Sequence, residues 1–134
     1  MCLITFQKKP IILSEDKIVY KALEKGLVSP YIRFIWELNK LYETKIETTD
    51  YGHFYDEEQR SIYEDDMGYV KDGVTRIGQG FHSFKNIEYI DTISNRRGFI
   101  WDIYECMIPA GSEYYEDKTG LCVSNKLIIK NKIQ

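Results

Sequence analysis

Short strand-like runs separated by turns fill the last third of this chain, and they constrain its fold more than any other feature. The runs are, in order, Phe99 to Ile108, Glu113-Tyr114-Tyr115, Leu121-Cys122-Val123 and Lys126 to Lys130. Turn sequences at 109–112 and 117–120 separate the first three runs. A parallel pair of strands needs a crossover of about a dozen residues or more, so this spacing predicts antiparallel pairing.

The stretch 31–38 fits two patterns. Every second residue is apolar, as in a strand buried on one face, but an apolar stripe through Tyr31, Phe34 and Leu38 fits a helix as well. The density of aromatic and β-branched residues favours the strand. Asn39-Lys40 then predicts a turn into a second strand at 41–46.

One helix is predicted at about 83–97. Ser83 is a good N-terminal cap, and the stripe Phe84, Ile87, Ile90 and Ile93 gives the helix one apolar side. Arg96, Arg97 and Gly98 are typical of a helix C-terminus, where positive charge and a left-handed residue are favourable.

An acidic segment precedes this helix. Residues 43–73 contain ten acidic and three basic side chains, a net charge of −7, which leaves +4 for the rest of a chain whose total is −3. We interpret about 47–73 as a long acidic excursion over the surface. Loops of this length are usually functional or mobile.

These elements predict a single α+β domain, residues 1–134. A strand at Lys17 to Leu23 joins the C-terminal strands in a small, mostly antiparallel sheet, which packs with the helix at about 83–97. The length lies in the usual range for one domain, and the 43% content of hydrophobic residues is enough to form a core.

Composition also bears on location and cofactors. No apolar run approaches the roughly 20 residues that span a bilayer, and the N-terminus lacks the pattern of a secretory signal, so we expect a cytoplasmic protein with no membrane partner. Cys2, Cys106 and Cys122 include no C-x-x-C pair, which predicts free thiols and no metal site. The sequence indicates no cofactor and has no direct nucleic-acid signature.

Several residues are candidates for ligand binding, and each also has a structural interpretation. His82 lies between a Gly-x-Gly turn and the predicted helix start, where backbone N–H groups can face an anion, but the structural interpretation, in which its ring bonds a carbonyl, is favoured. Arg96 and Arg97 can grip a phosphate or simply stabilise a helix end. Tyr114 and Tyr115 can form a stacking wall for a base or pack over the core.

The order of these motifs resembles an uncharacterised group of short proteins from phages and bacterial mobile elements. The residues that carry the resemblance are Val19-Tyr20-Lys21-Ala22-Leu23, Gly80-Phe81-His82-Ser83-Phe84, Cys106 to Tyr115 and Val123 to Ile129. The similarity spans nearly the whole chain and implies a mobile-element origin, but no activity.

More remotely, the chain is similar to the ADP-ribosyltransferase-like fold. Tyr20-Lys21 matches the first motif of that fold and His82-Ser83 the middle one, which implies an enzyme acting on NAD. The third motif needs a glutamate, and Ser124-Asn125-Lys126 offers no carboxylate.

We therefore expect a non-enzymatic binding protein that sequesters a nucleotide-like small molecule or blocks a host defence protein, with the transferase as the alternative. The residues expected to bind the ligand are Lys21, Phe81, His82, Ser83, Arg96, Arg97, Tyr114 and Tyr115. The sequence leaves the formation of a homo-oligomer open.

Overall fold

Nearly all of the regular secondary structure is antiparallel strand in the computed structural model, which describes residues 3–5, 7–30, 34–51, 74–90 and 101–133. The first six strands are β1 (Leu3–Thr5), β2 (Ile11–Ile12), β3 (Lys17–Leu23), β4 (Leu41–Glu43), β5 (Glu47–Tyr51) and β6 (Val74–Gln79). The others are β7 (Phe81–Phe84), β8 (Asp102–Ile108), β9 (Glu113–Glu116), β10 (Leu121–Ser124) and β11 (Lys126–Lys132).

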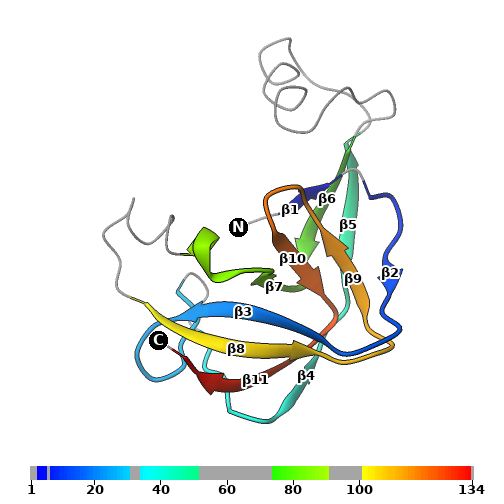
Figure 1. Cartoon of the computed structure of the whole chain (residues 1–134). Helices are drawn as coiled ribbons and strands as arrows, with labels where there is room; N and C mark the ends of the chain where they lie inside the picture. The colour runs from blue at the N-terminus through cyan, green and yellow to red at the C-terminus, as the bar shows by residue number, and fades with distance from the viewer. Residues whose placement is uncertain (1–2, 6, 31–33, 52–73, 91–100, 134) are drawn as a thin grey trace, which may run out of the picture.

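The strands form two sheets (Figure 1). The smaller sheet has the order β1-β6-β5, and the larger has the order β2-β9-β10-β7-β3-β8-β11-β4. Within the larger sheet, β3 pairs with β8 along its whole length, from Lys17 opposite Ile108 to Leu23 opposite Asp102. In contrast, β3 and β7 share the single pair Tyr20 and Phe84. The sheet therefore consists of two well-paired blocks joined at one position.

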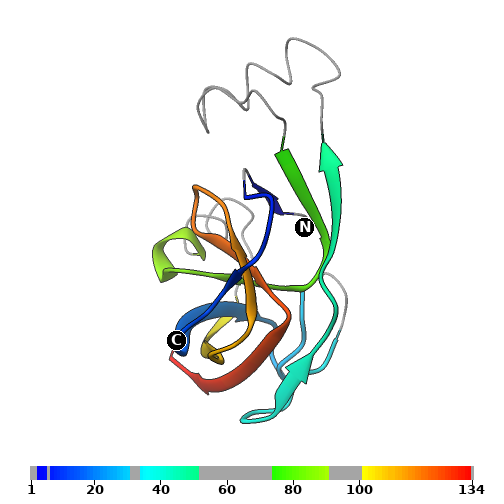
Figure 2. The same ribbon diagram turned by 90° about the vertical axis from the view of Figure 1, so that its right-hand side faces the viewer.

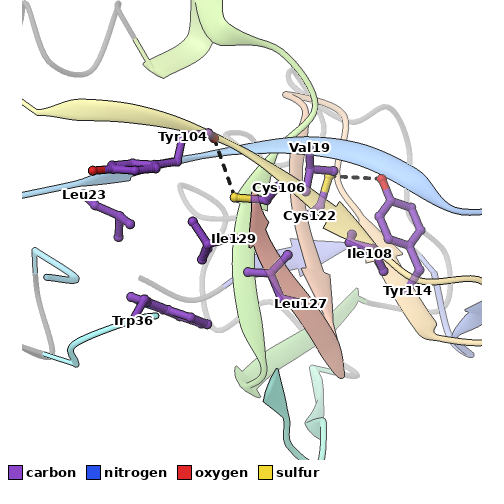
Figure 3. Close-up of a cluster of buried hydrophobic side chains, with 10 residues drawn as sticks. All are labelled: Val19, Leu23, Trp36, Tyr104, Cys106, Ile108, Tyr114, Cys122, Leu127 and Ile129. Atoms are coloured by element: carbon purple, nitrogen blue, oxygen red, sulfur yellow. Dashed lines mark hydrogen bonds between the residues drawn. The ribbon is translucent and has the colours of Figure 1, made fainter. Parts of the chain in front are cut away.

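Alternation along β3 separates two faces of the larger sheet. Val19 and Leu23 point to the inner face, where they join the main apolar core (Figure 3). The other members of that core are Trp36, Tyr104, Cys106, Ile108, Tyr114, Cys122, Leu127 and Ile129. Ala22 points to the outer face and packs with Ile90 and Ile103.

Gly80 carries the chain from β6 in the smaller sheet to β7 in the larger one. Its φ of +151° lies in a region that residues with a side chain rarely adopt, and a Cβ there would overlap Cγ1 of Val123. Val123 is fully buried in a second core cluster with Leu3 and Ile77 of the smaller sheet. The missing side chain of Gly80 thus permits close packing where the chain passes between the sheets.

Several strand predictions are confirmed. The strand at Lys17 to Leu23 has the bounds of β3. The C-terminal runs form β8, β9, β10 and β11, all paired antiparallel. The predicted strand at 41–46 is shorter than expected, because β4 ends at Glu43.

The predicted helix at about 83–97, and with it the α+β class, is wrong. Ser83 and Phe84 belong to β7, where Ser83 is opposite Cys122 and Phe84 is opposite Leu121. In the part of this region that the structure describes, helical geometry is limited to 87–90, and residues 91–97 lie outside the described residues. No helix of seven or more residues occurs among the described residues. Pairing with β10 buries Ser83 completely, and this tertiary contact overrides the local capping signal.

Two other expectations are corrected in part. The first five residues of the acidic excursion form β5, which pairs with β6, and 52–73 lie outside the described residues. Within 34–38, the part of the predicted strand that the structure describes, only single bridges at Ile35 and Leu38 are present. In the described part of the chain, no helix is long and apolar enough to cross a membrane.

Candidate functional site

Four of the residues expected to bind a ligand lie together where β3 meets β7. Lys21 comes from β3, and Phe81, His82 and Ser83 come from β7. The Nζ atom of Lys21 donates a hydrogen bond of 2.7 Å to the backbone carbonyl of His82. This bond crosses the position at which the two blocks of the larger sheet share a single strand pair.

Lys21 is an amine inside an apolar environment. It lies between Val19 and Leu23 on the inner face of β3, and its Nζ atom is 5.4 Å from the centre of the Trp36 ring. Burial disfavours the charged form and lowers the pKa of Lys21 to about 8. Its ammonium is therefore held by a carbonyl and an indole ring rather than by a carboxylate.

His82 and Ser83 are also shielded from water. Burial, and next the charge of Lys21, lower the pKa of His82 to about 4, so its ring is neutral at pH 7. Within the described residues, His82 Nε2 and Ser83 Oγ are buried atoms without a hydrogen-bond partner. His82 and Ser83 are consecutive residues of β7, so their side chains point to opposite faces, and only His82 is shown to sense the charge of Lys21.

Polar side chains continue from this point across the inner face of the sheet. Ser83 is opposite Cys122, which is opposite Glu116 on β9. The hydroxyl of Tyr114 lies 3.0 Å from Cys122 Sγ and 2.8 Å from Glu116 Oε2, and Lys85 Nζ lies 2.8 Å from the same carboxylate oxygen. Burial alone would raise the pKa of Glu116, but hydrogen bonds from Lys85 and Tyr114 hold it below its ordinary value.

The inner face of the sheet contains cysteine and serine side chains, which can act as nucleophiles, but none of those described is activated. Burial raises the pKa of Cys122 to about 11 and that of Cys106 to about 12, so both are neutral thiols at pH 7. Ser83 has no exposed surface and bonds no base among the described residues. Such an arrangement stabilises a polar interior and gives no support to covalent catalysis.

The structure does not place Tyr114 and Tyr115 in a common wall. Consecutive residues of a strand point to opposite faces, so Tyr114 enters the main core and Tyr115 packs with Leu3, Ile77 and Val123. Both are almost completely buried. Arg96 and Arg97, the other expected binding residues, lie outside the described residues.

An aromatic cluster that the sequence analysis missed lies beside Lys21. Its rings are Phe34, Trp36, Tyr42 and Phe81, with Trp36 at 4.9, 4.8 and 5.4 Å from the other three. Trp36 is buried and donates a 2.7 Å hydrogen bond to Ser29 Oγ, whereas Phe34 is exposed. The alternating apolar residues of 31–38 were the available signal, but they did not reveal that Tyr42 and the distant Phe81 pack against Trp36.

A row of apolar side chains crosses the outer face of the larger sheet. Ile18 is opposite Met107, Met107 is opposite Ile128, and Ile128 is opposite Leu41. Ile18 and Leu41, at the two ends, are 47% and 50% exposed. We call these four residues the outer row.

The described residues include no group of three or more His, Cys, Asp or Glu side chains that could hold a metal ion. Ser124, in the stretch matched to the third transferase motif, is buried and donates its hydroxyl hydrogen to the Lys126 carbonyl. Comparison of the chain with family models, curated proteins and solved structures finds no match.

Proposed function

We propose that this chain is a non-enzymatic binding protein that blocks a protein partner, and that the outer row is its contact surface. The mobile-element origin implied by the sequence resemblance makes a host defence protein the proposed target. The observation that carries the proposal is the uninterrupted row of Ile18, Met107, Ile128 and Leu41 across four strands.

The outer row differs from the scattered apolar residues of ordinary surfaces. Single exposed apolar side chains are normal, but a contiguous set rimmed by polar residues is typical of protein interfaces. Glu43 and Lys126 form the adjacent outward pair on one side of the row, and Tyr20 and Glu105 form the pair on the other. An apolar centre with a polar rim is the usual composition of such a contact.

The proposal can be tested by comparing what wild-type and variant proteins capture from a host-cell extract. Ile18→Lys and Leu41→Lys each place a charge at one end of the row. Ile35→Lys is the matched control, because Ile35 is 66% exposed and lies outside the row. The proposal expects a partner that binds wild type and the control but neither row variant. A partner that binds both row variants equally well, or capture of no partner at all, would contradict it.

A second candidate is the binding of a nucleotide-like small molecule at the aromatic cluster. The observation that favours it is the combination of stacked rings with two ammonium groups: Lys21 lies over Trp36, and Lys40 lies 5.2 Å from the centre of the Tyr42 ring. Aromatic faces can stack on a base while cations attract a phosphate.

Thermal unfolding with a panel of nucleotides and cyclic nucleotides tests this second candidate. A ligand of this site should raise the melting temperature of wild type and have a smaller effect on Phe34→Ala, since Phe34 is the exposed ring of the cluster. Ile35→Ala is the control, because it removes an exposed apolar side chain next in the chain. The candidate is rejected if no compound in the panel shifts the unfolding of wild type.

A further inference from the structure

Strand β2 is a terminal strand of the larger sheet, and its only strand partner among the described residues is β9 (Figure 2). Ile11 and Ile12 are 49% and 59% exposed, although they point to opposite faces. A strand at the edge of a sheet can present unpaired backbone groups to another strand. The direction of those groups in β2 decides whether this edge is available.

Hydrogen bonds of Leu13, the residue after Ile12, and of Glu113, the residue opposite Ile12, fix that direction. The Leu13 N–H donates to the Ser112 carbonyl at 3.0 Å, and the Leu13 carbonyl accepts from the Gly111 N–H at 2.7 Å, so both groups of Leu13 face the β9 hairpin. Glu113, which is opposite Ile12, instead uses its N–H and carbonyl to bond Asn125. Because backbone groups alternate between the two edges of a strand, the N–H and carbonyl of Ile12 face the open edge.

Charged residues flank β2 with opposite signs. Lys9 precedes it, Glu15 follows it, and both side chains are exposed. The next residues outward continue the pattern, with Lys8 on one side and Asp16 on the other. When a segment of this kind is laid antiparallel to a copy of itself, each basic end meets an acidic end.

We propose that a second copy of this chain docks on the open edge of β2, with the two β2 strands antiparallel about a two-fold axis at Ile12. The two Ile12 residues then exchange both N–H to carbonyl bonds across the axis. On each side of the axis, Ser14 of one copy lies opposite Pro10 of the other and donates its N–H to the Pro10 carbonyl. Pro10 has no N–H to donate in return, so each Ser14–Pro10 pair has one hydrogen bond instead of two. The same register places Lys9 beside Glu15 of the other copy and Lys8 beside Asp16.

The contact is self-complementary, as an isologous interface requires. The chain bends at Lys9 and again at Ser14 and Glu15. The strand-to-strand hydrogen bonds therefore lie around Ile11 and Ile12, and the charged side chains lie at the two ends of the contact. An interface this short belongs among the small ones, below about 1,200 Å², and should form a weak, reversible dimer. Exposed ion pairs at its ends should make dimerisation weaker at high salt.

Sedimentation velocity of the full chain, from about 10 μM to about 1 mM, tests the proposal by charge exchange. Lys9→Glu and Glu15→Lys each place like charges at both ends of the contact and should weaken dimerisation about tenfold. In an equimolar mixture of the two variants, a heterodimer again has opposite charges at both ends of the contact. The mixture should therefore dimerise as wild type does. Lys118→Glu, an exposed charge reversal far from β2 in the sequence, is the control for net charge and should leave dimerisation unchanged.

Proline substitution gives an independent readout. Ile12→Pro removes the N–H that faces the second copy and should abolish dimerisation while the circular dichroism spectrum stays native. The proposal is overturned if wild type is monomeric up to about 1 mM, if the mixed variants fail to recover dimerisation, or if association is lost in Ile18→Lys and not in Lys9→Glu. The last result would assign self-association to the outer row.

Discussion

The sulfur atom of Cys122 lies 3.0 Å from the hydroxyl oxygen of Tyr114 in the interior of the larger sheet. Because the carboxylate of Glu116 can only accept, Tyr114 donates to Glu116, while the Cys122 thiol lies within hydrogen-bond distance of both the Tyr114 hydroxyl and the Gly120 carbonyl. Lys85 pairs with the same carboxylate oxygen. A buried thiol is thus connected through a phenol to a partly exposed ion pair.

The two described thiols should be inert in the folded protein. Burial raises the pKa of Cys106 to about 12 and that of Cys122 to about 11, so the thiolate that attacks a disulfide reagent is scarce at about pH 8. In a Cys2→Ser background, titration with an aromatic disulfide should detect no thiol in the native state and two after denaturation. Rapid labelling of either cysteine before unfolding would show that the interior is open to the reagent.

Tyr114→Phe should lower the free energy of unfolding by about 1–2 kcal/mol. The variant keeps the ring in the core but leaves the Cys122 thiol without its hydroxyl partner and removes one donor from Glu116. Urea denaturation measures the loss. Tyr42→Phe is the matched control, because its hydroxyl accepts a hydrogen bond from the N–H of the exposed residue Glu37, and it should change stability by less.

The stability of wild type should rise relative to Lys21→Met between about pH 8 and pH 10.5. Burial lowers the pKa of Lys21 to about 8 in the folded protein, against 10.5 ordinarily, so the unfolded chain binds the proton over this interval and the folded protein does not. The difference in unfolding free energy should change by about 3 kcal/mol in favour of wild type. Urea denaturation at both ends of the interval checks this, with Lys25→Met, on an exposed turn, as the control.

Acid should destabilise the protein partly through His82. Its pKa is lowered from 6.5 to about 4, so as the pH falls through this range the unfolded chain takes up a proton that the folded protein refuses. Wild type should lose up to about 3 kcal/mol by this route, and His82→Asn should show a flatter stability curve over the same range. Parallel curves for the two proteins would mean that the imidazole is more accessible than its surroundings indicate.

Gly80→Ala should be the most damaging glycine substitution among the turns described. It combines the strain of a φ of +151° with overlap on Cγ1 of the buried Val123, and we expect a loss of about 3 kcal/mol or more. Gly111→Ala has the strain of a φ of +85° but meets nothing within 4 Å, so it should cost only about 1 kcal/mol. The two melting temperatures measure these losses, and Gly80→Ala should have the lower one.

Strands whose signals were purely local could be predicted from the sequence. Lys17–Leu23 is dense in β-branched and aromatic residues, and the turns after Ile108 and Glu116 mark their hairpins directly. The helix prediction failed because Phe84, Ile87 and Ile90 fit a helical stripe while Phe81–Phe84 also fits a strand. Pairing of Ser83 with Cys122, a contact between segments far apart in the chain, decided between the two.

The candidate site shows the same limit. Lys21 and His82 lie together in the structure, but their contact is a bond from an amine to a backbone carbonyl, which no side-chain motif encodes. The opposite orientation of Tyr114 and Tyr115 follows from strand alternation once β9 is recognised. Trp36 and Ile12 gain their roles only from what surrounds them: the rings around the indole and the unpaired edge beside the isoleucine.

Strands β3 and β7 are joined by one residue pair, Tyr20 with Phe84. Strands β3 and β8 are joined by seven residue pairs. A local opening of the larger sheet therefore breaks the fewest strand-pair contacts when β3 separates from β7. Such an opening admits water to the Lys21 amine and the Ser83 hydroxyl while both blocks of strands stay intact. The Lys21 amine and the buried Ser83 hydroxyl therefore lie at the strand junction that we expect to open most readily.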